Sequence, residues 1–396
     1  LSGRARGINP SPTMAITALA NRMKAEGIDV IGFGAGEPDF DTPDHVKAAA
    51  IEAIQAGFSK YTAAAGIIEL REAVTVKLKR DNGLDYAPDA VVITSGSKQA
   101  LYNLAMILFD KGDEVVVPSP YWVSYPEQIR LAEATPVFAP TSEARGFSLT
   151  RKDVERVLSS RTKALIVNSP SNPTGAVIRS DQLQRIAALA VERNFFLISD
   201  EAYDALTYDG IPHVSIASMG EEVKARTIVV GSASKTYAMT GWRLGYAAGP
   251  KEIIKVMADL QSQSTSNTTS ITQKAAIAAL VGPQECVATM RNEFDRRRRV
   301  MVDRLRAMPG ITCEMPRGAF YAFPNISHYN GRRTPAGKQI QGSSDFIGFL
   351  LEAARIAAIP GVDFGSDRHI RLSYALSMPL LEEGMARMAA ALKTIP

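Results

Sequence analysis

The amino-acid sequence predicts an α/β protein in which a mostly parallel sheet is covered by helices on both faces. From about residue 90 to residue 248, short apolar and β-branched runs alternate with polar turns and helical patterns, and this alternation is typical of parallel sheets with crossover helices. After about residue 285 the alternation loosens, which indicates a smaller α+β part. We therefore expect residues 46–285 to form a large domain, and residues 1–45 with 286–396 to form a small one.

The N-terminal region shows helical and strand patterns in turn. We expect helices over residues 12–26, over 44–56 and from Gly66 to Arg80, and a strand over 28–33. The strand ends in the glycine-rich turn Gly34-Ala-Gly-Glu-Pro-Asp-Phe40. Because this turn matches neither the G-x-G-x-x-G fingerprint nor a Walker A loop, the sequence predicts no dinucleotide or nucleotide site there.

The same patterns place the remaining elements. Strands are expected over residues 90–94, 114–117, 163–167, 195–198, 227–230 and 244–248. Helices are expected over residues 99–109, after residue 125 and up to residue 193. The C-terminal region predicts a long helix to residue 308, strands near residues 311 and 319, a helix from residue 344, a strand over 369–374 and a final helix. The Ser/Thr-rich stretch 262–272 is short, so we expect a structured loop rather than a linker.

The composition is that of a globular protein. Of the 396 residues, 46% are hydrophobic and 22% are charged. No apolar run approaches the roughly 20 residues that cross a bilayer, so we expect no membrane association. Cys286 and Cys313 are isolated, and the four histidines lack metal-ligand spacing. We therefore expect no metal site, no disulfide and a reducing, cytoplasmic location.

A run of arginines at residues 296–299 is the densest basic cluster. It lies in a helical pattern but off the apolar stripe of that helix, with Asp295 and Asp303 nearby. We interpret the run as a solvated helix face rather than a nucleic-acid patch, and expect no nucleic-acid partner. The net charge of +4 is mild and equally suits anionic small ligands.

Lys235 is the first candidate for chemistry. It follows the strand at residues 227–230 and the small residues 231–234, at the end of a strand where open α/β sheets bind ligands. A lysine near apolar walls and other cations loses proton affinity and can bond covalently to an aldehyde. A solvated loop lysine is the alternative. Ser232-x-x-Lys235 also fits the nucleophile motif of penicillin-binding enzymes, but its S-D-N and K-T-G companions are missing.

Other polar residues follow neighbouring strands at the same end. Parallel strands share that edge, so residues 95–98, Asn172, Asp200 and Lys235 are expected to converge. Each has a structural alternative: Ser97 as a helix cap, Asn172 in a turn, and Asp200 as a solvated strand end. All of these structural roles together are less probable than a common site.

The converging groups suit a ligand with a phosphate and an aldehyde. A phosphate fits the backbone N–H groups at the start of the helix near residue 99, because the helix dipole favours an anion. Ser232 and Arg243 can complete the phosphate site, and Lys235 offers an amine to the aldehyde.

The remaining groups suit an aromatic ring. Asp200 can pair with a protonated ring nitrogen, Asn172 and Tyr203 can donate to a phenolate, and Trp122 offers a flat face for stacking. Phosphate, aldehyde, pyridinium and phenolate together describe pyridoxal phosphate.

Six ordered motifs carry a family resemblance. They are Ala35-Gly-Glu-Pro-Asp-Phe40, Pro120-Tyr-Trp-Val-Ser-Tyr125, Asn168-Ser-Pro-Ser-Asn-Pro-Thr-Gly175, Ser199-Asp-Glu-Ala-Tyr203, Ser234-Lys235 with Ala238-Met-Thr-Gly-Trp-Arg243, and Arg371-Leu-Ser-Tyr-Ala375. From about Asn9 to its end, the sequence resembles the class I aminotransferases and, within them, the bacterial aspartate aminotransferases of the Ib subgroup. The resemblance implies fold type I of the pyridoxal-phosphate enzymes and a homodimer with shared active sites.

The resemblance also implies roles for individual residues. Lys235 bonds to the cofactor, Asp200 pairs with its ring nitrogen, and Asn172 and Tyr203 bind its phenolate oxygen. Catalysis falls to Lys235, Asp200 and Tyr203. The other implied cofactor contacts are Gly96, Ser97, Lys98, Ser232 and Arg243 around the phosphate, Trp122 on the ring, and Tyr61 at the phosphate of the neighbouring subunit.

For the substrate, the resemblance implies a clamp on each carboxylate. Arg371 holds the α-carboxylate, aided by Asn172 and the Gly36 backbone, while Trp122 borders the same site. The distal carboxylate is implied to meet Lys98, Ser11 and Thr13. Related enzymes that accept prephenate carry lysine where this chain has Asn9, which weakens a prephenate assignment. Pro12 replaces a small residue and can reshape the same loop.

The predicted function is therefore transamination of aspartate and glutamate with 2-oxoglutarate or oxaloacetate by a ping-pong mechanism. The alternatives within this fold are an aromatic or prephenate aminotransferase and a β-lyase, which the fold alone does not separate. A regulatory or nucleic-acid-binding protein on the same scaffold is a further alternative. It requires an added DNA-binding segment, for which no room exists before Asn9.

Overall fold

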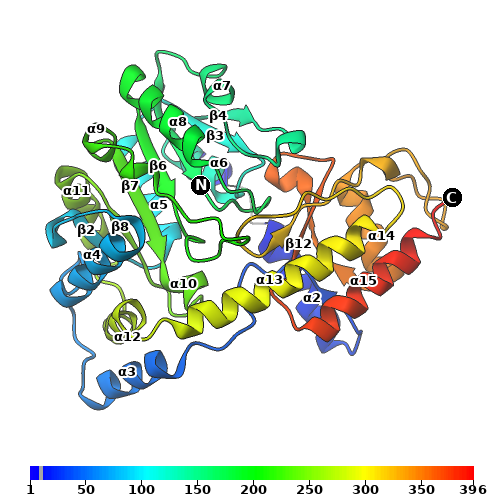
Figure 1. The fold of residues 1–396 in the computed structure, drawn as a ribbon, viewed down its shortest axis with the longest axis horizontal. Helices are drawn as coiled ribbons and strands as arrows, with labels where there is room; N and C mark the ends of the chain where they lie inside the picture. The colour runs from blue at the N-terminus through cyan, green and yellow to red at the C-terminus, as the bar shows by residue number, and fades with distance from the viewer. Residues whose placement is uncertain (9–11) are drawn as a thin grey trace.

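A computed structural model of the chain describes residues 1–8 and 12–396. A seven-stranded sheet lies between two layers of helices, and a smaller part built from the N-terminal and C-terminal segments packs beside it (Figure 1). The sheet order is β2 (Val91–Thr94), β8 (Gly245–Ala248), β7 (Thr227–Ser232), β6 (Phe196–Asp200), β5 (Thr162–Asn168), β3 (Glu114–Ser119) and β4 (Thr135–Pro140).

The direction of β8 is the exception in this sheet. It pairs antiparallel with both β2 and β7, whereas the other described pairs of the sheet are parallel. The carboxyl ends of six strands therefore share one edge with the amino end of β8. This reversal brings the residues just before β8, including Arg243, to the same edge as Asp200 and Lys235.

Alternate side chains of each strand enter opposite hydrophobic layers. Val115 and Val117 of β3 pack in one layer, and Val116 packs in the other. Because both faces are covered, the strands are almost continuously apolar. The first layer contains α5 (Ser97–Leu108), α6 (Ser124–Leu131) and α11 (Lys251–Ser262). The second contains α3 (Asp44–Gln55), α4 (Ile68–Asn82), α8 (Ser180–Arg193), α9 (Glu221–Lys224) and α12 (Ser270–Val281).

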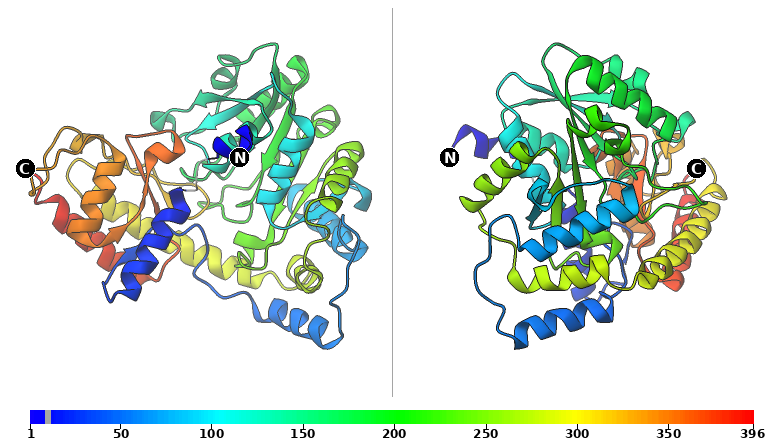
Figure 2. Two further views of the ribbon diagram at one scale, coloured as in Figure 1. Left: turned by 180° about the vertical axis from the view of Figure 1, so that it is seen from behind. Right: turned by 60° about the vertical axis from the view of Figure 1, so that its left-hand side comes forward.

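The smaller part has its own core, centred on residues such as Phe294, Phe346 and Leu372. Its helices are α2 (Pro12–Ala25), α13 (Glu285–Arg306), α14 (Ser343–Ala354) and α15 (Met378–Leu392). Its short strands are β1 (Ile31–Gly32) with β10 (Ile356–Ala357), and β11 (Ile359–Pro360), β12 (Ile370–Ser373) and β9 (Tyr321–Ala322). The N-terminal α2 packs beside these C-terminal elements (Figure 2). The division at residues 46 and 286 stays a prediction.

The predicted α/β class is confirmed, as are the strands over 90–94, 114–117, 163–167, 195–198, 227–230 and 244–248 within a few residues. The strand expected over 28–33 is only β1, because just two of its residues pair with β10. Near residue 311 a single bridge joins Thr312 to Asn325. The loop expected over 262–272 is shorter, since helices α11 and α12 extend into it. The sequence analysis missed β4 on the sheet edge.

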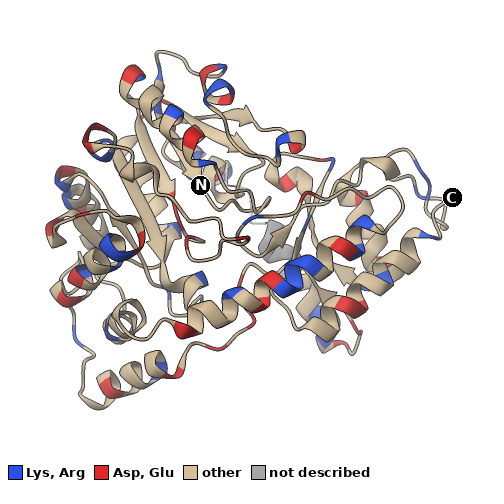
Figure 3. Cartoon of the chain, viewed as in Figure 1, with Lys and Arg blue, Asp and Glu red and all other residues tan. Residues whose placement is uncertain are grey.

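The arginine run corrects one prediction. Acidic and basic residues lie close together along α13 (Figure 3), but Arg297 and Arg298 are only 5% and 0% exposed. Arg297 pairs with Asp39 at 2.7 Å, and Arg298 pairs with Asp209 at 2.8 Å. The expectation of a solvated face is therefore wrong for these two residues, because loops from elsewhere cover that side of α13.

Two further expectations concern absences. Among the described residues, no helix is both long and apolar enough to cross a membrane. The same part of the chain contains no group of three or more histidine, cysteine, aspartate or glutamate side chains arranged to hold a metal ion.

Candidate active site

A cavity of about 430 Å³ lies at the carboxyl edge of the sheet, between the sheet and the smaller part. Its walls come from both. The elements around the large sheet contribute Ser97, Trp122, Tyr125, Asn168, Asn172, Asp200, Ala202, Tyr203, Lys235 and Thr240. The smaller part contributes residues 34–37, Tyr321 and Arg371. The predicted convergence is observed for Ser97, Asn172, Asp200 and Lys235, whereas Ser95 and Lys98 line a neighbouring groove.

Lys235 lies in the short helix α10 (Ala233–Thr236), directly after β7. Its Nζ donates a hydrogen bond to the carbonyl oxygen of Gly36. Burial lowers the pKa of Lys235 to about 8, with Glu37 opposing the shift and the nearby cations, Arg371 first, adding to it. More of this amine is therefore neutral near pH 7 than for an ordinary lysine, and a neutral amine attacks an aldehyde.

Asp200 ends β6 and is 4% exposed. Its carboxylate accepts hydrogen bonds from Tyr125 Oη at 2.6 Å and from the Ala202 N–H at 3.2 Å. Burial raises the pKa of Asp200 to about 6 in spite of these donors. A cationic partner inside the cavity favours the ionised form, so the site suits a protonated ring nitrogen.

Arg371 on β12 is 2% exposed. Its Nη1 donates to Asn172 Oδ1 at 3.0 Å and its Nη2 to the Gly34 carbonyl at 2.8 Å, while Nε has no hydrogen-bond partner in the described structure. Its guanidinium also lies over the rings of Tyr321 and Phe364, at 4.5 and 5.0 Å from the centroids. Burial lowers its pKa, but a guanidinium stays protonated at neutral pH. This buried cation suits a carboxylate.

An anion site lies at the amino end of α5. Gly96 has a φ of +83°, and a Cβ placed there would lie 2.4 Å from Arg243 Nη2, so only glycine lets the guanidinium approach this closely. Arg243 donates to the carbonyl oxygens of Thr240 and Ser95 at 2.7 and 3.3 Å. The amino end of α5 has no side-chain cap, so its first backbone N–H groups, the helix dipole and Arg243 together favour a phosphate.

Two tyrosines and a tryptophan form the aromatic wall. The Tyr203 and Tyr321 hydroxyls lie 2.8 Å apart, and burial raises the pKa of Tyr203 well above its ordinary value. Tyr203 is therefore protonated and can donate to an anionic oxygen. Trp122 lines the cavity and meets Tyr125 edge to face, with 5.3 Å between centroids.

Several predicted residues lie outside this cavity. Lys98 is exposed and lines a neighbouring groove of about 680 Å³, with its Nζ 5.0 Å from the Trp122 ring. Tyr61 is 92% exposed. Ser232 caps α10, its Oγ accepting from the Ser234 N–H at 3.3 Å. Ser11 and Asn9 lie outside the described residues, as does the side chain of Thr13 on α2.

Several cavity residues had no role predicted from the sequence, and three of these hold other groups of the site. Tyr125 was part of a quoted motif without a role, and its hydroxyl proves to hold Asp200. Tyr321 lies 118 positions after Tyr203, which it meets, and the sequence around it carries no signal for this contact. Asn168 holds the backbone of its neighbours, since its Oδ1 accepts from the Asn172 N–H at 2.9 Å.

Relatives of known activity resemble the whole chain. Residues 28–388 match the family described as aminotransferase class I and II. The chain is 47% identical over 388 residues to an aspartate aminotransferase of Geobacillus stearothermophilus, with 98% of each protein covered. It is also 47% identical over 397 residues to a probable aspartate/prephenate aminotransferase of Aquifex aeolicus, covering 100% of this chain and 99% of the relative.

Solved structures agree. The aspartate aminotransferase of Rhizobium meliloti superimposes with a TM-score of 0.96 at 42% identity, covering 100% of this chain and 99% of the other. The Thermus thermophilus aspartate aminotransferase with maleate gives 0.93 at 43% identity, covering 99% of each. The chain therefore belongs to the class I and II aminotransferases, and its cofactor is pyridoxal phosphate. The predicted family, fold type and cofactor are confirmed.

The residues of the cavity fit this cofactor. Lys235 offers a partly neutral amine to the aldehyde, and Asp200 is a buried carboxylate that a ring cation would stabilise. The amino end of α5 with Arg243 suits the phosphate. When bound, pyridoxal phosphate supplies an electron sink for the bond broken at the amino-acid carbon.

The first prediction concerns the Lys235 amine. We expect cofactor-free protein to take up pyridoxal phosphate at a rate that rises about tenfold per pH unit and levels off above about pH 8, because only the neutral amine attacks the aldehyde. Stopped-flow absorbance measures this rate. Borohydride reduction should then attach the cofactor to the peptide containing Lys235, with Lys235→Met as the control. Attachment at another lysine would contradict the assignment.

The second prediction concerns Asp200. The variant Asp200→Ala should retain cofactor but remove the Cα proton of an amino acid about a hundredfold or more slowly, because the ring loses its buried carboxylate partner. Single-turnover kinetics with normal and Cα-deuterated substrate measures this step. Asp181→Ala, which removes an exposed carboxylate on α8, is the matched control. An unchanged rate in Asp200→Ala would show that proton removal does not need this partner.

Proposed function

We propose that the chain transfers the amino group of L-aspartate or L-glutamate to 2-oxoglutarate or oxaloacetate by a ping-pong reaction in the cavity around Lys235. Arg371 is the observation that carries the proposal. It is a buried guanidinium with an unpartnered Nε, placed in the same cavity as Lys235. Such a group suits the α-carboxylate that every amino acid carries.

Each side chain has a proposed role. Arg371 and Asn172 orient the α-carboxylate, so that the Cα–H bond faces Lys235. The Lys235 amine would accept the Cα proton and return it to the cofactor carbon on the other side of the amino nitrogen. Asp200 holds a proton on the ring nitrogen, and Tyr203 donates to the ring oxygen. A single cavity that accepts the amino acid and then the keto acid gives ping-pong kinetics.

The preference for dicarboxylic acids rests on other support. The relatives at 47% identity include an aspartate aminotransferase, and the Thermus thermophilus structure holds maleate, a dicarboxylate. In this chain Lys98 lies against Trp122, which also lines the cavity. We propose that Lys98 reaches the distal carboxylate of the substrate, with Ser11 and Thr13.

Prephenate is the second candidate substrate. The Aquifex aeolicus relative, and another from Nitrosomonas europaea at 45% identity, carry both aspartate and prephenate in their names. Asn9, where lysine is expected in enzymes that accept prephenate, weighs against it. A comparison of kcat/KM for prephenate and for 2-oxoglutarate as amino acceptors, with aspartate as the amino donor in both, tests whether prephenate is a substrate.

We propose a homodimer with shared active sites. Tyr61 is an exposed aromatic side chain that contacts no part of its own cavity in the described structure. This placement suits a residue that serves a second copy of the chain.

The proposed cytoplasmic location rests on Cys286 and Cys313, both of which are free thiols.

The third prediction separates the two substrate cations. Arg371→Ala should lower kcat/KM about 10²- to 10⁴-fold for aspartate and phenylalanine alike, because it removes a bidentate bond to a group both carry. Lys98→Ala should lower kcat/KM about tenfold to a hundredfold for aspartate alone. Lys111→Ala, which removes an exposed lysine in the turn after α5, is the control. An unchanged aspartate-to-phenylalanine ratio in Lys98→Ala would contradict the substrate proposal.

The fourth prediction tests the shared site by complementation. Tyr61→Ala and Lys235→Ala should each be weak alone. Mixed dimers should recover about a quarter of the wild-type activity, because half of the dimers are mixed and each has one intact site of two. Mixing Arg371→Ala with Lys235→Ala is the control, since both side chains belong to one cavity and no site is restored. No recovery with Tyr61→Ala would place Tyr61 in its own subunit's site.

A further inference from the structure

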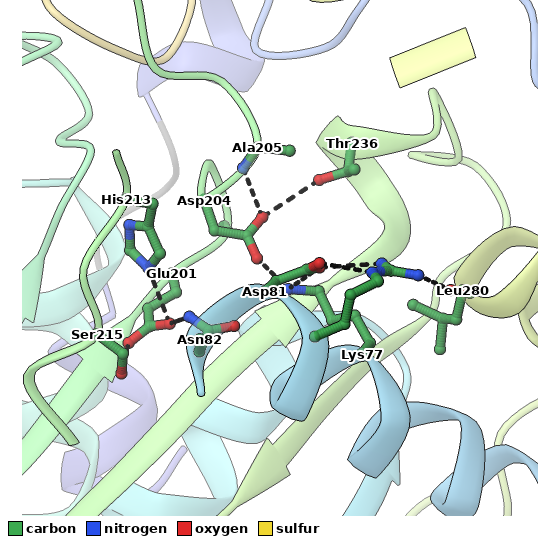
Figure 4. A network of polar contacts seen from close by, with 12 residues as sticks. Lys77, Asp81, Asn82, Glu201, Asp204, Ala205, His213, Ser215, Thr236 and Leu280 are labelled. Carbon is green, nitrogen blue, oxygen red and sulfur yellow. Dashed lines mark hydrogen bonds and ion pairs between the residues drawn. The ribbon is translucent and has the colours of Figure 1, made fainter. Parts of the chain in front are cut away.

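A buried ionic network lies beside the cavity, on the side of α4 (Figure 4). Lys77 on α4 has a side chain that is 6% exposed, and it pairs with Asp204, whose side chain is 10% exposed. Asp81, one turn further along α4, lies 3.4 Å from the same Lys77 amine. The established chemistry of the site uses none of these three residues.

The network includes the residues that come directly after Tyr203 and Lys235 in the sequence. Asp204 comes directly after Tyr203, and Thr236 comes directly after Lys235. The Thr236 hydroxyl donates to Asp204 Oδ1 at 3.4 Å, and the Ala205 N–H donates to the same oxygen at 2.8 Å. One carboxylate therefore joins the backbone that carries Tyr203 to the helix that carries Lys235, and Lys77 holds that carboxylate.

A second group of buried polar contacts surrounds Glu201, the residue after Asp200. The Glu201 side chain is 3% exposed and accepts from Asn82 Nδ2, at the end of α4, at 3.0 Å. His213 Nε2 lies 3.0 Å from the same carboxylate. Helix α4 thus contacts the residues next to Tyr203 and Lys235 through Lys77 and Asp204, and the residue next to Asp200 through a separate contact between Asn82 and Glu201.

Lys77 and Asp204 each keep the other in its charged form in spite of burial. Burial opposes the charge on Lys77, but Asp204 and Asp81 outweigh it, and the pKa of Lys77 lies above its ordinary value. Burial likewise opposes the charge on Asp204, yet Lys77 holds its pKa below the ordinary value. A buried ion pair of this kind adds little net stability compared with apolar residues of similar volume, whereas it fixes geometry because both charges must meet.

We propose that Lys77 and Asp204 are positioning residues that hold Tyr203 and Lys235 at the separation which amino transfer requires. Neither touches the substrate or the cofactor. Their effect is to fix where the Tyr203 hydroxyl and the Lys235 amine stand relative to each other across the cavity. A displacement on the order of 1 Å between reacting groups can cost about a hundredfold in rate.

The test replaces the ion pair by an apolar pair of similar size, Lys77→Met/Asp204→Leu. The control is Lys79→Met/Asp85→Leu, which removes an exposed ion pair between the same helix and the segment just after it, where the two side chains are 62% and 79% exposed. Both variants are purified with pyridoxal phosphate bound. Three quantities are measured: the midpoint of thermal unfolding, the pH at which the absorbance of the bound cofactor changes, and kcat with KM for aspartate.

We expect Lys77→Met/Asp204→Leu to unfold near the wild-type temperature but to lose about tenfold to a hundredfold in kcat, with little change in KM. The absorbance change should move to higher pH by about half a pH unit or more, because a displaced Tyr203 no longer stabilises the anionic ring oxygen. A purely structural role would move the unfolding midpoint alone. The control should match wild type in all three measurements.

Unchanged absorbance pH and kcat in Lys77→Met/Asp204→Leu would overturn the proposal. If this variant does not fold, Thr236→Val decides, since it removes only the hydroxyl that meets Asp204. Thr236→Val should shift both quantities in the same direction by a smaller amount, and no shift would overturn the proposal. The absorbance is measured without amino acid, so this result does not depend on whether aspartate is the substrate.

Discussion

The site depends on keeping ionisable groups of both signs out of water in one cavity. Burial moves the pKa of Asp200 up to about 6 and that of Lys235 down to about 8, so each is poised between its charged and neutral forms. Such groups persist only where hydrogen bonds compensate them. Tyr125 supplies one to Asp200, and Gly36 accepts one from Lys235. A bound ligand that brings a ring cation and an aldehyde relieves both costs at once.

Two supports of the cavity come from opposite parts of the chain. The sheet edge supplies Asp200 and Lys235, whereas the smaller part supplies Arg371 and the loop carrying Gly34. The Arg371–Gly34 hydrogen bond joins residues 337 positions apart. The arrangement therefore exists only when both parts are folded and packed, which makes the substrate clamp a property of the whole tertiary structure.

The sequence was informative where local pattern determines position. Asp200 and Lys235 follow buried strands, and strand ends converge in any parallel sheet. Tyr321 and Tyr125 were not predictable in this way, because their contacts depend on how separate elements pack. The same limit explains the error at Arg297. A helical stripe shows which side chains face the main core, but it does not show that the loop with Asp39 covers another side of α13. Edge strand β4 was not predicted because its sequence, Thr-Pro-Val-Phe-Ala-Pro, lacks the continuous apolar run of a buried strand, in keeping with its mixed exposure.

The four consecutive arginines of α13 differ in burial and in their contacts, so we expect substitutions at them to differ in their effect on stability. Arg296 is exposed and pairs with Glu293 on its own helix, so substitution by lysine or glutamine there should cost little stability. Arg298 is fully enclosed and holds both Asp209 and the Pro316 carbonyl. A lysine at that position cannot form the same fork of bonds. Neighbouring arginines of this run are therefore expected to differ in their tolerance of substitution, because the Arg298 guanidinium joins the loops that carry Asp209 and Pro316.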